Sequence, residues 1–334
     1  EKEYAEIKKL IDSLMAILKD PKRVLEVITQ EVEAVKAKYG DVRRTKIYKA
    51  AIGQFSEEDL VAKEETLITV TKTGYIKRVA RGTYKSQRRG GKGVIGMSTK
   101  EEDEISHLLT ASTHDLILFF TDRGRVFGAK AWEIPESSRQ AKGQALVNFL
   151  NLEQGEEIRS ILPLDKNGGG KNLIMATALG IVKKTPLSQY ENLRTSGLIA
   201  IRLRGGDALV SAHITKGDDH IIVVTKKGKA IRFPEANARP MGRATSGVAG
   251  MRMEEGDVVI SMEVFPSKLP KVSDKRRKVF RDVLTISQRG LGKRTPVKFF
   301  PIQRRAGKGV KAAVVNERTG NLSAAVMVNE KMEQ

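Results

Sequence analysis

Residues 219–233 read DHIIVVTKKGKAIRF, and this stretch decides the fold. A run of β-branched residues, Ile221 to Val224, is followed by Thr225, two lysines and Gly228, after which a second apolar run begins. β-Branched runs favour strands, and a glycine between two of them supplies the positive φ that a tight turn requires. The hydroxyl of Thr225 can bond the backbone of the same turn. The stretch therefore predicts a β-hairpin.

The hairpin pattern occurs five times in the 334 residues. Each copy has an apolar strand, a Thr or Ser, two residues, a glycine and a second strand. This second strand carries Lys or Arg in four copies, and Lys130 lies just beyond it in the other. The copies are residues 65–79, 114–129, 171–185, 219–233 and 282–296, with turn glycines Gly74, Gly124, Gly180, Gly228 and Gly290. Repeats of about 50 residues built from short strands are typical of blades arranged around an axis.

A second glycine motif follows every hairpin, 17 to 19 residues after the turn glycine. It reads QRRGGKG at residues 87–93 and QRRAGKG at 303–309, and the other copies end at Gly143, Gly197 and Gly247. An arginine lies three or four residues before each second glycine, namely Arg89, Arg139, Arg194, Arg243 and Arg305. Because equivalent positions recur at similar radius in successive blades, we expect these arginines to form a curved basic track. Such a track suits the bending of a long polyanion.

The net charge of +20 is carried by the repeats. The first 62 residues hold 12 Lys and Arg and 12 Asp and Glu, so the excess lies in the rest of the chain. A strongly basic domain favours a polyanionic partner, most often nucleic acid, because binding releases condensed counterions. Aromatic residues make up only 5% of the sequence, which argues against single-strand binding by base stacking. We therefore expect double-stranded DNA as the partner, and the alternative is an ordinary basic protein.

The neutral N-terminal part has the pattern of two helices. Apolar residues at spacings of three and four form a coiled-coil seam over the first helix, Asp20-Pro21 separates the helices, and Gly40 suits the last C-terminal cap. We expect a helical segment at residues 1–40, a linker at 41–64 and blades over 65–334. The chain starts without methionine and within a helix, so we expect a piece of a longer chain.

Several kinds of site are disfavoured. There is no cysteine, and the four histidines are too scattered to hold a metal. No apolar run reaches the roughly 20 residues of a membrane helix, so we expect a cytoplasmic protein. A phosphate-binding P-loop is excluded at residues 90–93 because Gly93 follows Lys92 where Ser or Thr is required. The acidic run EEDE at 101–104 is expected to be an exposed loop.

These motifs closely resemble the C-terminal DNA-wrapping domain of the DNA gyrase A subunit. QRRGGKG at 87–93 matches the seven-residue box of that family without substitution, and the resemblance continues through KYGDVRRT (38–45), THDLILFFT (113–121) and RPMGRATSGVAGMR (239–252). The resemblance implies a mainly β fold, the β-pinwheel. In this propeller relative, neighbouring four-stranded blades exchange strands, and residues 1–40 end a coiled-coil connector.

The family normally has six blades, whereas this sequence has five repeats. They span about residues 65–112, 113–168, 169–217, 218–280 and 281–334. We therefore expect the sixth blade to be missing, either through truncation or as a natural variant.

The resemblance also implies function. Such a domain bends duplex DNA around a basic rim with positive handedness, so that the ATP-dependent holoenzyme introduces negative supercoils. The DNA-binding box carried over from the family is Gln87, Arg88, Arg89, Gly90, Gly91, Lys92 and Gly93. Further DNA contacts are expected from Lys77, Arg78, Arg139, Lys142, Lys183, Lys184, Arg194, Arg232, Arg243, Lys293, Arg294, Arg304, Arg305 and Lys308.

The resemblance places the chemistry elsewhere in the enzyme. No tyrosine here lies in the context of the family's catalytic tyrosine, so no catalytic residue, metal or cofactor is expected in this chain. ATP and Mg²⁺ are implied for other domains of the type II topoisomerase, an isomerase. The implied partners are duplex DNA, a second gyrase A subunit, and the gyrase B subunit in an A2B2 heterotetramer. The implied location is the nucleoid region of a bacterial-type cytoplasm.

Two alternatives stay open. One is the corresponding C-terminal domain of topoisomerase IV, whose family usually has a degenerate or missing box. The other is a propeller-like protein-interaction module that is basic only incidentally. The intact QRRGGKG counts against the first, and the arginine before every second glycine counts against the second.

Overall fold

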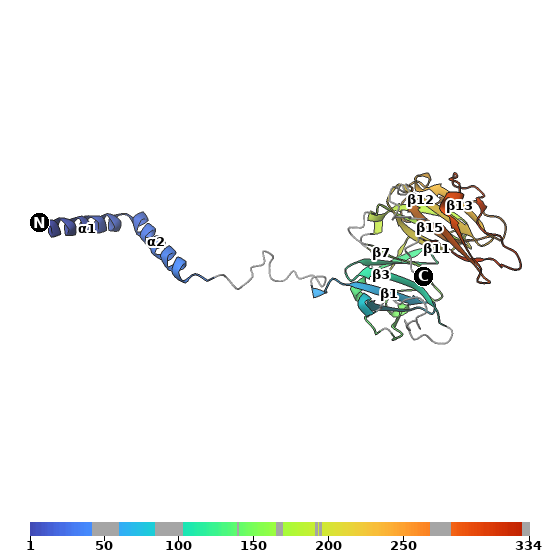
Figure 1. The fold of residues 1–334 in the computed structure, drawn as a ribbon, viewed down its shortest axis with the longest axis horizontal. Coiled ribbons are helices and arrows are strands. Elements are labelled where there is room, and N and C mark those ends of the chain that lie inside the picture. The colour runs from blue at the N-terminus through green and yellow to red at the C-terminus, as the bar shows by residue number, and fades with distance from the viewer. Residues whose placement is uncertain are drawn as a thin grey trace, which may run out of the picture. The chain divides into compact units, whose positions relative to one another are not determined.

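The computed structural model describes residues 1–41, 60–83, 103–138, 140–164, 170–190, 193, 196–267 and 282–328. The chain divides into two compact units, Glu1–Ser56 and Glu57–Gln334. Both are drawn in Figure 1. Among the described residues, no helix has the length and apolar character needed to cross a membrane.

The first unit contains two helices, α1 (Lys2–Lys19) and α2 (Pro21–Tyr39). Asp20 ends α1 and caps α2, because its side chain accepts a hydrogen bond from the backbone N–H of Lys22 at 3.0 Å. Gly40 is the C-cap of α2 at a φ of −72°, so this helix ends without a left-handed residue. Neither helix has a buried residue, and the apolar seam is therefore exposed.

The second unit contains the five predicted hairpins. The first strands are β1 (Glu65–Thr71), β4 (Leu116–Thr121), β8 (Asn172–Thr177), β12 (Asp219–Thr225) and β16 (Asp282–Ser287). The second strands are β2 (Tyr75–Ala80), β5 (Arg125–Lys130), β9 (Ile181–Pro186), β13 (Lys229–Pro234) and β17 (Gly292–Pro296). Each hairpin pairs antiparallel with a third strand, which is β3 (Ile105–Ser112), β7 (Ile158–Leu164), β11 (Leu209–Thr215), β15 (Val259–Pro266) or β19 (Leu322–Val328). We number the five blades in this order.

The hairpin turns form as the sequence predicts. All five turn glycines have positive φ, between +74° and +85°. The Thr or Ser that ends each first strand accepts a hydrogen bond from a backbone N–H four residues later, as in Lys229 N–H to Thr225 Oγ1 at 3.2 Å. The same bond is made by Thr71, Thr121, Thr177 and Ser287 at 3.1 to 3.3 Å. The repeated hydroxyl and glycine therefore both belong to the turn.

Neighbouring blades exchange strands, as the resemblance implies. Four two-residue strands follow the second glycine motifs, namely β6 (Gln144–Ala145), β10 (Leu198–Ile199), β14 (Val248–Ala249) and β18 (Val310–Lys311). Each pairs with the second strand of the preceding blade, giving the sheet orders β3-β1-β2-β6, β10-β5-β4-β7, β11-β8-β9-β14 and β15-β12-β13-β18. The last sheet, β17-β16-β19, has three strands within the described part of the chain.

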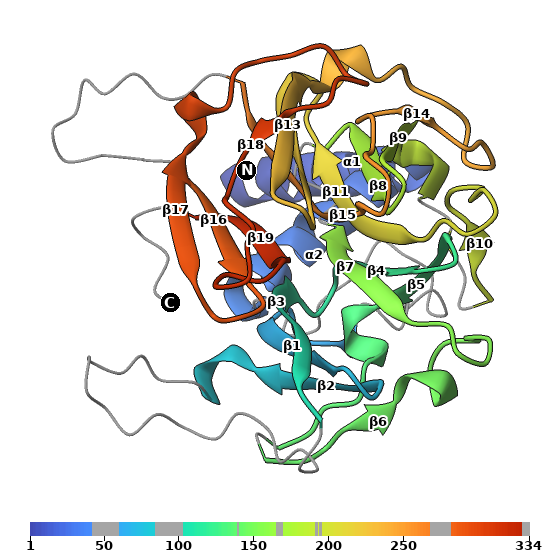
Figure 2. The same cartoon turned by 90° about the vertical axis from the view of Figure 1, so that its right-hand side faces the viewer.

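The third strands lie at the centre of the unit, where they contact one another in sequence order (Figure 2). Serines on these strands link adjacent blades through side-chain hydrogen bonds to backbone carbonyls. Ser160 Oγ donates to the carbonyl of Ala212 at 3.1 Å, and Ser261 Oγ donates to that of Ala325 at 2.6 Å. Each exchanged strand lies at the opposite edge of its sheet, so the segment before it belongs to the outer rim.

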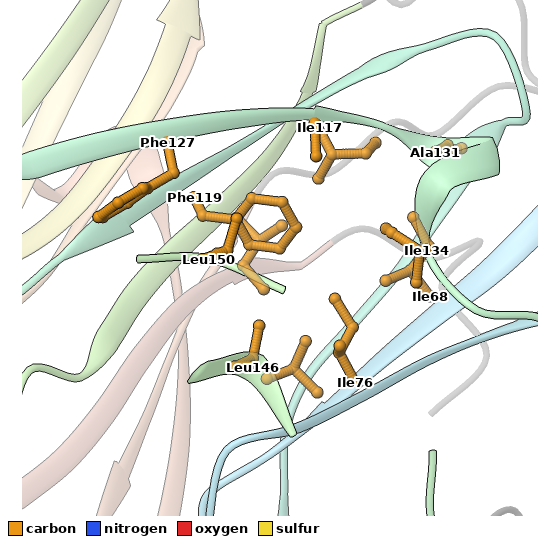
Figure 3. Close-up of a cluster of buried hydrophobic side chains, with 13 residues drawn as sticks. Ile68, Ile76, Ile117, Phe119, Phe127, Ala131, Ile134, Leu146 and Leu150 are labelled. Atoms are coloured by element: carbon orange, nitrogen blue, oxygen red, sulfur yellow. The ribbon is translucent and has the colours of Figure 1, made fainter. Parts of the chain in front are cut away.

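The hydrophobic core lies between the blades. The cluster in Figure 3 joins Ile68 and Ile76 of blade 1 to Phe119 and Phe127 of blade 2, all with 0% exposure. Further clusters pack blades 2 and 3, 3 and 4, and 4 and 5 against each other. Both faces of an inner blade are therefore covered, so basic side chains on its second strand lie against a neighbouring blade.

Single-turn 3₁₀ helices follow the second strands, including η2 (Ala131–Glu133), η4 (Leu187–Tyr190), η5 (Glu235–Asn237) and η6 (Val297–Phe299).

Candidate nucleic-acid interface

The predicted DNA-binding residues fall into three groups. The box residues Gln87, Arg88, Arg89, Gly90, Gly91, Lys92 and Gly93, together with Arg139 and Arg194, lie outside the described residues. A second group lies on the strands after the turn glycines. The third group lies on the segments that end at the second glycines, which we call the rim loops: residues 140–143, 242–247 and 303–309.

The third residue after the turn glycine is a buried lysine in blades 1 and 3. Lys77 and Lys183 both have 0% exposure. The Lys77 ammonium donates to the carbonyl of Ala141 at 3.0 Å, and that of Lys183 donates to the carbonyl of Ala200 at 2.6 Å. Neither side chain presents a surface to phosphate, because the next blade covers it.

The fourth residue after the turn glycine reaches the 3₁₀ helix of the next blade. Arg78 Nε donates to the carbonyl of Ile134 at 3.2 Å, and Lys184 Nζ donates to that of Glu235 at 3.1 Å. Arg232 Nη1 likewise donates to the carbonyls of Val297 and Phe300 at 3.2 and 3.3 Å. Lys184 and Arg232 are only 5% and 9% exposed. For Lys77, Arg78, Lys183, Lys184 and Arg232 we therefore replace the predicted DNA contact by a role in joining blades.

The corresponding cations of blade 5 are exposed, because no following blade covers them within the described residues. Lys293 Nζ donates to the carbonyl of Ala312 at 3.4 Å, and Arg294 forms an ion pair with Asp282. Both keep solvent-accessible side chains on the outer strand of this blade. Of the cations predicted on the second strands, these two can therefore still meet a ligand at the surface.

The two described rim arginines occupy equivalent places in successive blades. Arg243 Nη1 donates to the carbonyl of Gln189 at 3.2 Å, and Arg305 Nε donates to that of Asn237 at 2.9 Å. Gln189 and Asn237 each lie nine residues after a turn glycine. Both arginines are half-buried, and the acceptors of these bonds are neutral carbonyls. The guanidinium charges are therefore held in place without being neutralised by these contacts.

Exposed cations flank Arg305 on its rim loop. Arg304 and Lys308 lie on either side of Arg305, and neither forms an ion pair with a carboxylate in the described part of the chain. On the rim loop of blade 2, the Lys142 ammonium lies 3.6 Å from the centroid of the Tyr75 ring. The rim loop at 303–309 therefore offers three cationic side chains close together.

The second glycines seat the rim loops on the preceding blade. A Cβ atom at Gly143 would lie 2.4 Å from the carbonyl oxygen of Ile76, and one at Gly247 would lie 2.7 Å from that of Val182. Both glycines also have positive φ. The constant spacing of 17 to 19 residues thus reflects packing against a neighbouring strand. In the described copies, the close backbone approach at these glycines is to protein.

An aspartate that caps the hairpin turn in three blades was missed in the sequence. Asp207 Oδ1 accepts from the backbone N–H of Leu179 at 2.9 Å, and Asp257 Oδ1 accepts from that of Lys227 at 2.9 Å. Asp103 does the same for Thr73 at 3.0 Å and is only 7% exposed, so the expectation of an exposed EEDE loop is wrong at this residue. Burial acts to raise the pKa of Asp103, and its hydrogen bonds, mainly from Thr73, outweigh burial and lower it. A carboxylate two residues before the third strand in four repeats was the available signal.

Comparisons with known proteins agree on one family. The sequence profile of the DNA gyrase C-terminal domain, described as a beta-propeller, matches residues 65–112, 115–165, 171–216, 219–266 and 281–329. The DNA gyrase A subunit of Pseudomonas aeruginosa is 40% identical over 374 residues, covering 99% of this chain and 39% of that protein. The DNA gyrase A subunit of Staphylococcus aureus is 39% identical over 323 residues, covering 96% of this chain and 35% of that protein. The chain thus spans less than two fifths of these relatives.

Solved structures show the same architecture. The C-terminal domain of DNA topoisomerase IV superposes with a TM-score of 0.64 at 28% identity, covering 80% of this chain and 79% of that one. A DNA gyrase A C-terminal domain gives a TM-score of 0.63 at 27% identity, covering 80% and 84%. The similarity in fold does not separate these two relatives.

Proposed function

Because the chain belongs to the DNA gyrase C-terminal domain family, we propose that it binds duplex DNA along its rim loops and wraps it around the blades. The observation that carries this proposal is the rim loop at 303–309, where Arg304, Arg305 and Lys308 gather without carboxylate partners in the described part of the chain. It is the near twin of QRRGGKG at 87–93, the box assigned from the family.

The rim loops suit a wrapped duplex because each is seated on the preceding blade in the same way. Bending DNA by tens of degrees costs on the order of 1–6 kcal/mol, so a wrapping surface must offer cations all along the path. Phosphate contacts provide this without reading base sequence. We therefore expect affinity to depend steeply on salt and weakly on sequence.

We extend the proposal to the holoenzyme from the family. The domain would wrap the duplex with positive handedness and present its continuation to a gate formed by other domains, where strand passage introduces negative supercoils. The gyrase B subunit would supply ATP hydrolysis with Mg²⁺, and two copies of each of the A and B chains would assemble in the bacterial cytoplasm. The intact box favours gyrase over topoisomerase IV.

The test is topological. The chain should bind duplexes of about 100 base pairs or longer much better than 20-mers, because only a long duplex can follow several rim loops. It should also leave positive superhelicity in a nicked plasmid that is religated in its presence. An unchanged plasmid at saturating protein would contradict wrapping.

Replacing Arg88, Arg89 and Lys92 by alanine should reduce the topological shift of the plasmid more than it reduces the affinity for linear duplex, because other blades keep their cations.

A further inference from the structure

The rim loop of blade 4 rests on a buried ammonium group. Lys183 lies on β9 of blade 3, and its Nζ donates to the carbonyl of Arg243 as well as to that of Ala200, the latter at 2.6 Å. Arg243 is the rim arginine of the loop at 242–247. A second contact fixes the same residue, since its backbone N–H donates to Gln189 Oε1 at 2.8 Å. The position of Arg243 is therefore set from blade 3.

The charge of Lys183 is not neutralised by a carboxylate among the described residues. Its two acceptors are backbone carbonyls, and the hydroxyl of Tyr190 shares the carbonyl of Ala200 at 3.4 Å. Burial, followed by the nearby charge of Arg243, lowers the pKa of Lys183 to about 8. An apolar residue would fill this site at lower electrostatic cost, so burying the lysine here carries a penalty in stability.

A buried lysine also contacts the rim loop between blades 1 and 2. The Lys77 ammonium donates to the carbonyls of Ser138 and Ala141, which flank the rim arginine position of that loop. Burial lowers the pKa of Lys77 as well. Blades 2 and 4 have Phe127 and Ile231 at the equivalent position, so the blade fold itself does not require the lysine.

We propose that Lys183 and Lys77 are positioning residues for DNA binding, which hold the rim loops of blades 4 and 2 by their carbonyls and add positive charge beneath them. The proposal rests on the proposed function, since it names how the phosphate-binding loops are fixed. It differs from a purely structural role because it links order in a loop to affinity for DNA.

The variant Lys183→Met tests the effect of loop order on DNA binding while the exposed charges of the loop stay unchanged. Methionine keeps most of the buried volume but leaves the carbonyl of Arg243 without the Lys183 donor and that of Ala200 with only the longer contact from the Tyr190 hydroxyl, while the Arg243 side chain remains. We expect faster amide hydrogen exchange over residues 243–247 and a roughly three- to ten-fold loss of affinity for a duplex of about 100 base pairs, equivalent to about one decade at most. Lys9→Met, which removes an exposed lysine on α1, outside the blades, is the charge-matched control.

Chemical rescue tests the ammonium directly. The chain has no cysteine, so Lys183→Cys provides a single thiol. Alkylation in denaturant with 2-bromoethylamine, then refolding, restores an ammonium at nearly the original length. Alkylation with 1-bromopropane gives the uncharged analogue of the same shape. Only the first product should recover protection of residues 243–247 and DNA affinity.

Two outcomes would overturn the proposal: unchanged exchange in Lys183→Met, or a loosened loop with the affinity of the unsubstituted chain. Equal recovery by both alkylated products would also do so, because the charge would then be dispensable. If the unsubstituted chain failed to bind long duplexes, the proposed function would fall, while the exchange data would still report on the loop. Should Lys183→Met fail to fold, Lys77→Met with exchange at residues 140–143 gives the same comparison.

Discussion

Ala306 is the one residue other than glycine with a positive φ in the described part of the chain, at +65°. It lies in the rim loop at 303–309, where the corresponding residue of the box is Gly90. A side chain in the left-handed region costs about 1–2 kcal/mol, so QRRAGKG stores strain that QRRGGKG avoids. Alanine in place of glycine at this position of the heptad therefore lowers the stability of the folded loop.

Ala306→Gly should raise the free energy of unfolding by about 0.5–1 kcal/mol, because relief of the strain exceeds the entropy that glycine adds to the unfolded chain. Chemical denaturation monitored by circular dichroism measures this. Ala244→Gly, on the rim loop of blade 4 at ordinary φ, is the matched control and should lower stability. A loss of stability in both variants would contradict the strain argument.

Glu263 on β15 is a second residue that lowers the stability of the fold, and here the effect depends on pH. Burial raises its pKa from 4.5 to about 7, and a hydrogen bond with the backbone of Met327 opposes this shift only in part. Because the folded pKa is raised, the contribution of Glu263 to stability is full below pH 4.5 and is lost as pH rises towards 7 and above. Glu263→Gln should therefore weaken the fall in stability between pH 5 and pH 8.

The measurement is urea denaturation of both proteins across this range. Glu255→Gln, at an exposed glutamate, should keep the pH dependence of the unsubstituted chain. Half-buried His213 changes stability in the opposite direction, since desolvation lowers its pKa, but it is present in every variant and cancels in the comparison. Parallel curves for Glu263→Gln and the unsubstituted chain would show that this carboxyl is not the group responsible.

At the scale of elements, the exchanged strand depends on its glycine. Gly247 has a φ of +88° and precedes β14, which pairs with β9 through Val248 and Val182. Gly247→Ala should lower the free energy of unfolding by about 2–3 kcal/mol, because strain and the clash with the Val182 carbonyl act together. Thermal melts of the variants measure this, and Gly205→Ala, where a Cβ meets nothing within 4 Å, should be nearly neutral. Similar losses in both would mean that the second glycine serves no packing role.

The elements also show what could be predicted from sequence. The hydroxyl and glycine of each turn act within one hairpin, so their spacing in the sequence was sufficient to predict the turn. The partner of a second glycine lies in the preceding repeat, and the pattern within a single repeat carries no information on it. The buried lysines were misread because alternation normally exposes one side of a strand. Here both faces are covered, so adjacent Lys183 and Lys184 are both buried.

At the scale of the whole molecule, the charge of +20 overstates the cationic surface. Several lysine and arginine side chains are buried between blades, while exposed ones such as Arg304 and Lys308 lie on rim loops. The sequence could predict the total and its restriction to the repeats. It could not predict which cations reach the surface, because that depends on contacts between repeats.

Arg304→Ala with Lys308→Ala should lower the slope of log affinity against log salt by roughly two, since each phosphate contact contributes about 0.9. Titration of a fluorescent duplex of about 100 base pairs at several salt concentrations measures the slope. Replacing exposed Lys8 and Lys9 of α1 by alanine removes the same charge outside the blades and should change the slope less. Equal changes would mean that DNA senses only the net charge.

The exchange of strands fixes the order in which the blades can be completed during synthesis. Blade 1 has its first two strands once residue 80 has been made, but its sheet is completed only by Gln144 and Ala145. The same delay of about one repeat separates the making and the closing of every later blade that receives a strand. During synthesis from the N-terminus, the newest blade therefore always displays one unpaired edge, and the ribosome itself supplies the strand that covers it. Assembly of the unit is thus ordered by translation, each repeat finishing the one made before it.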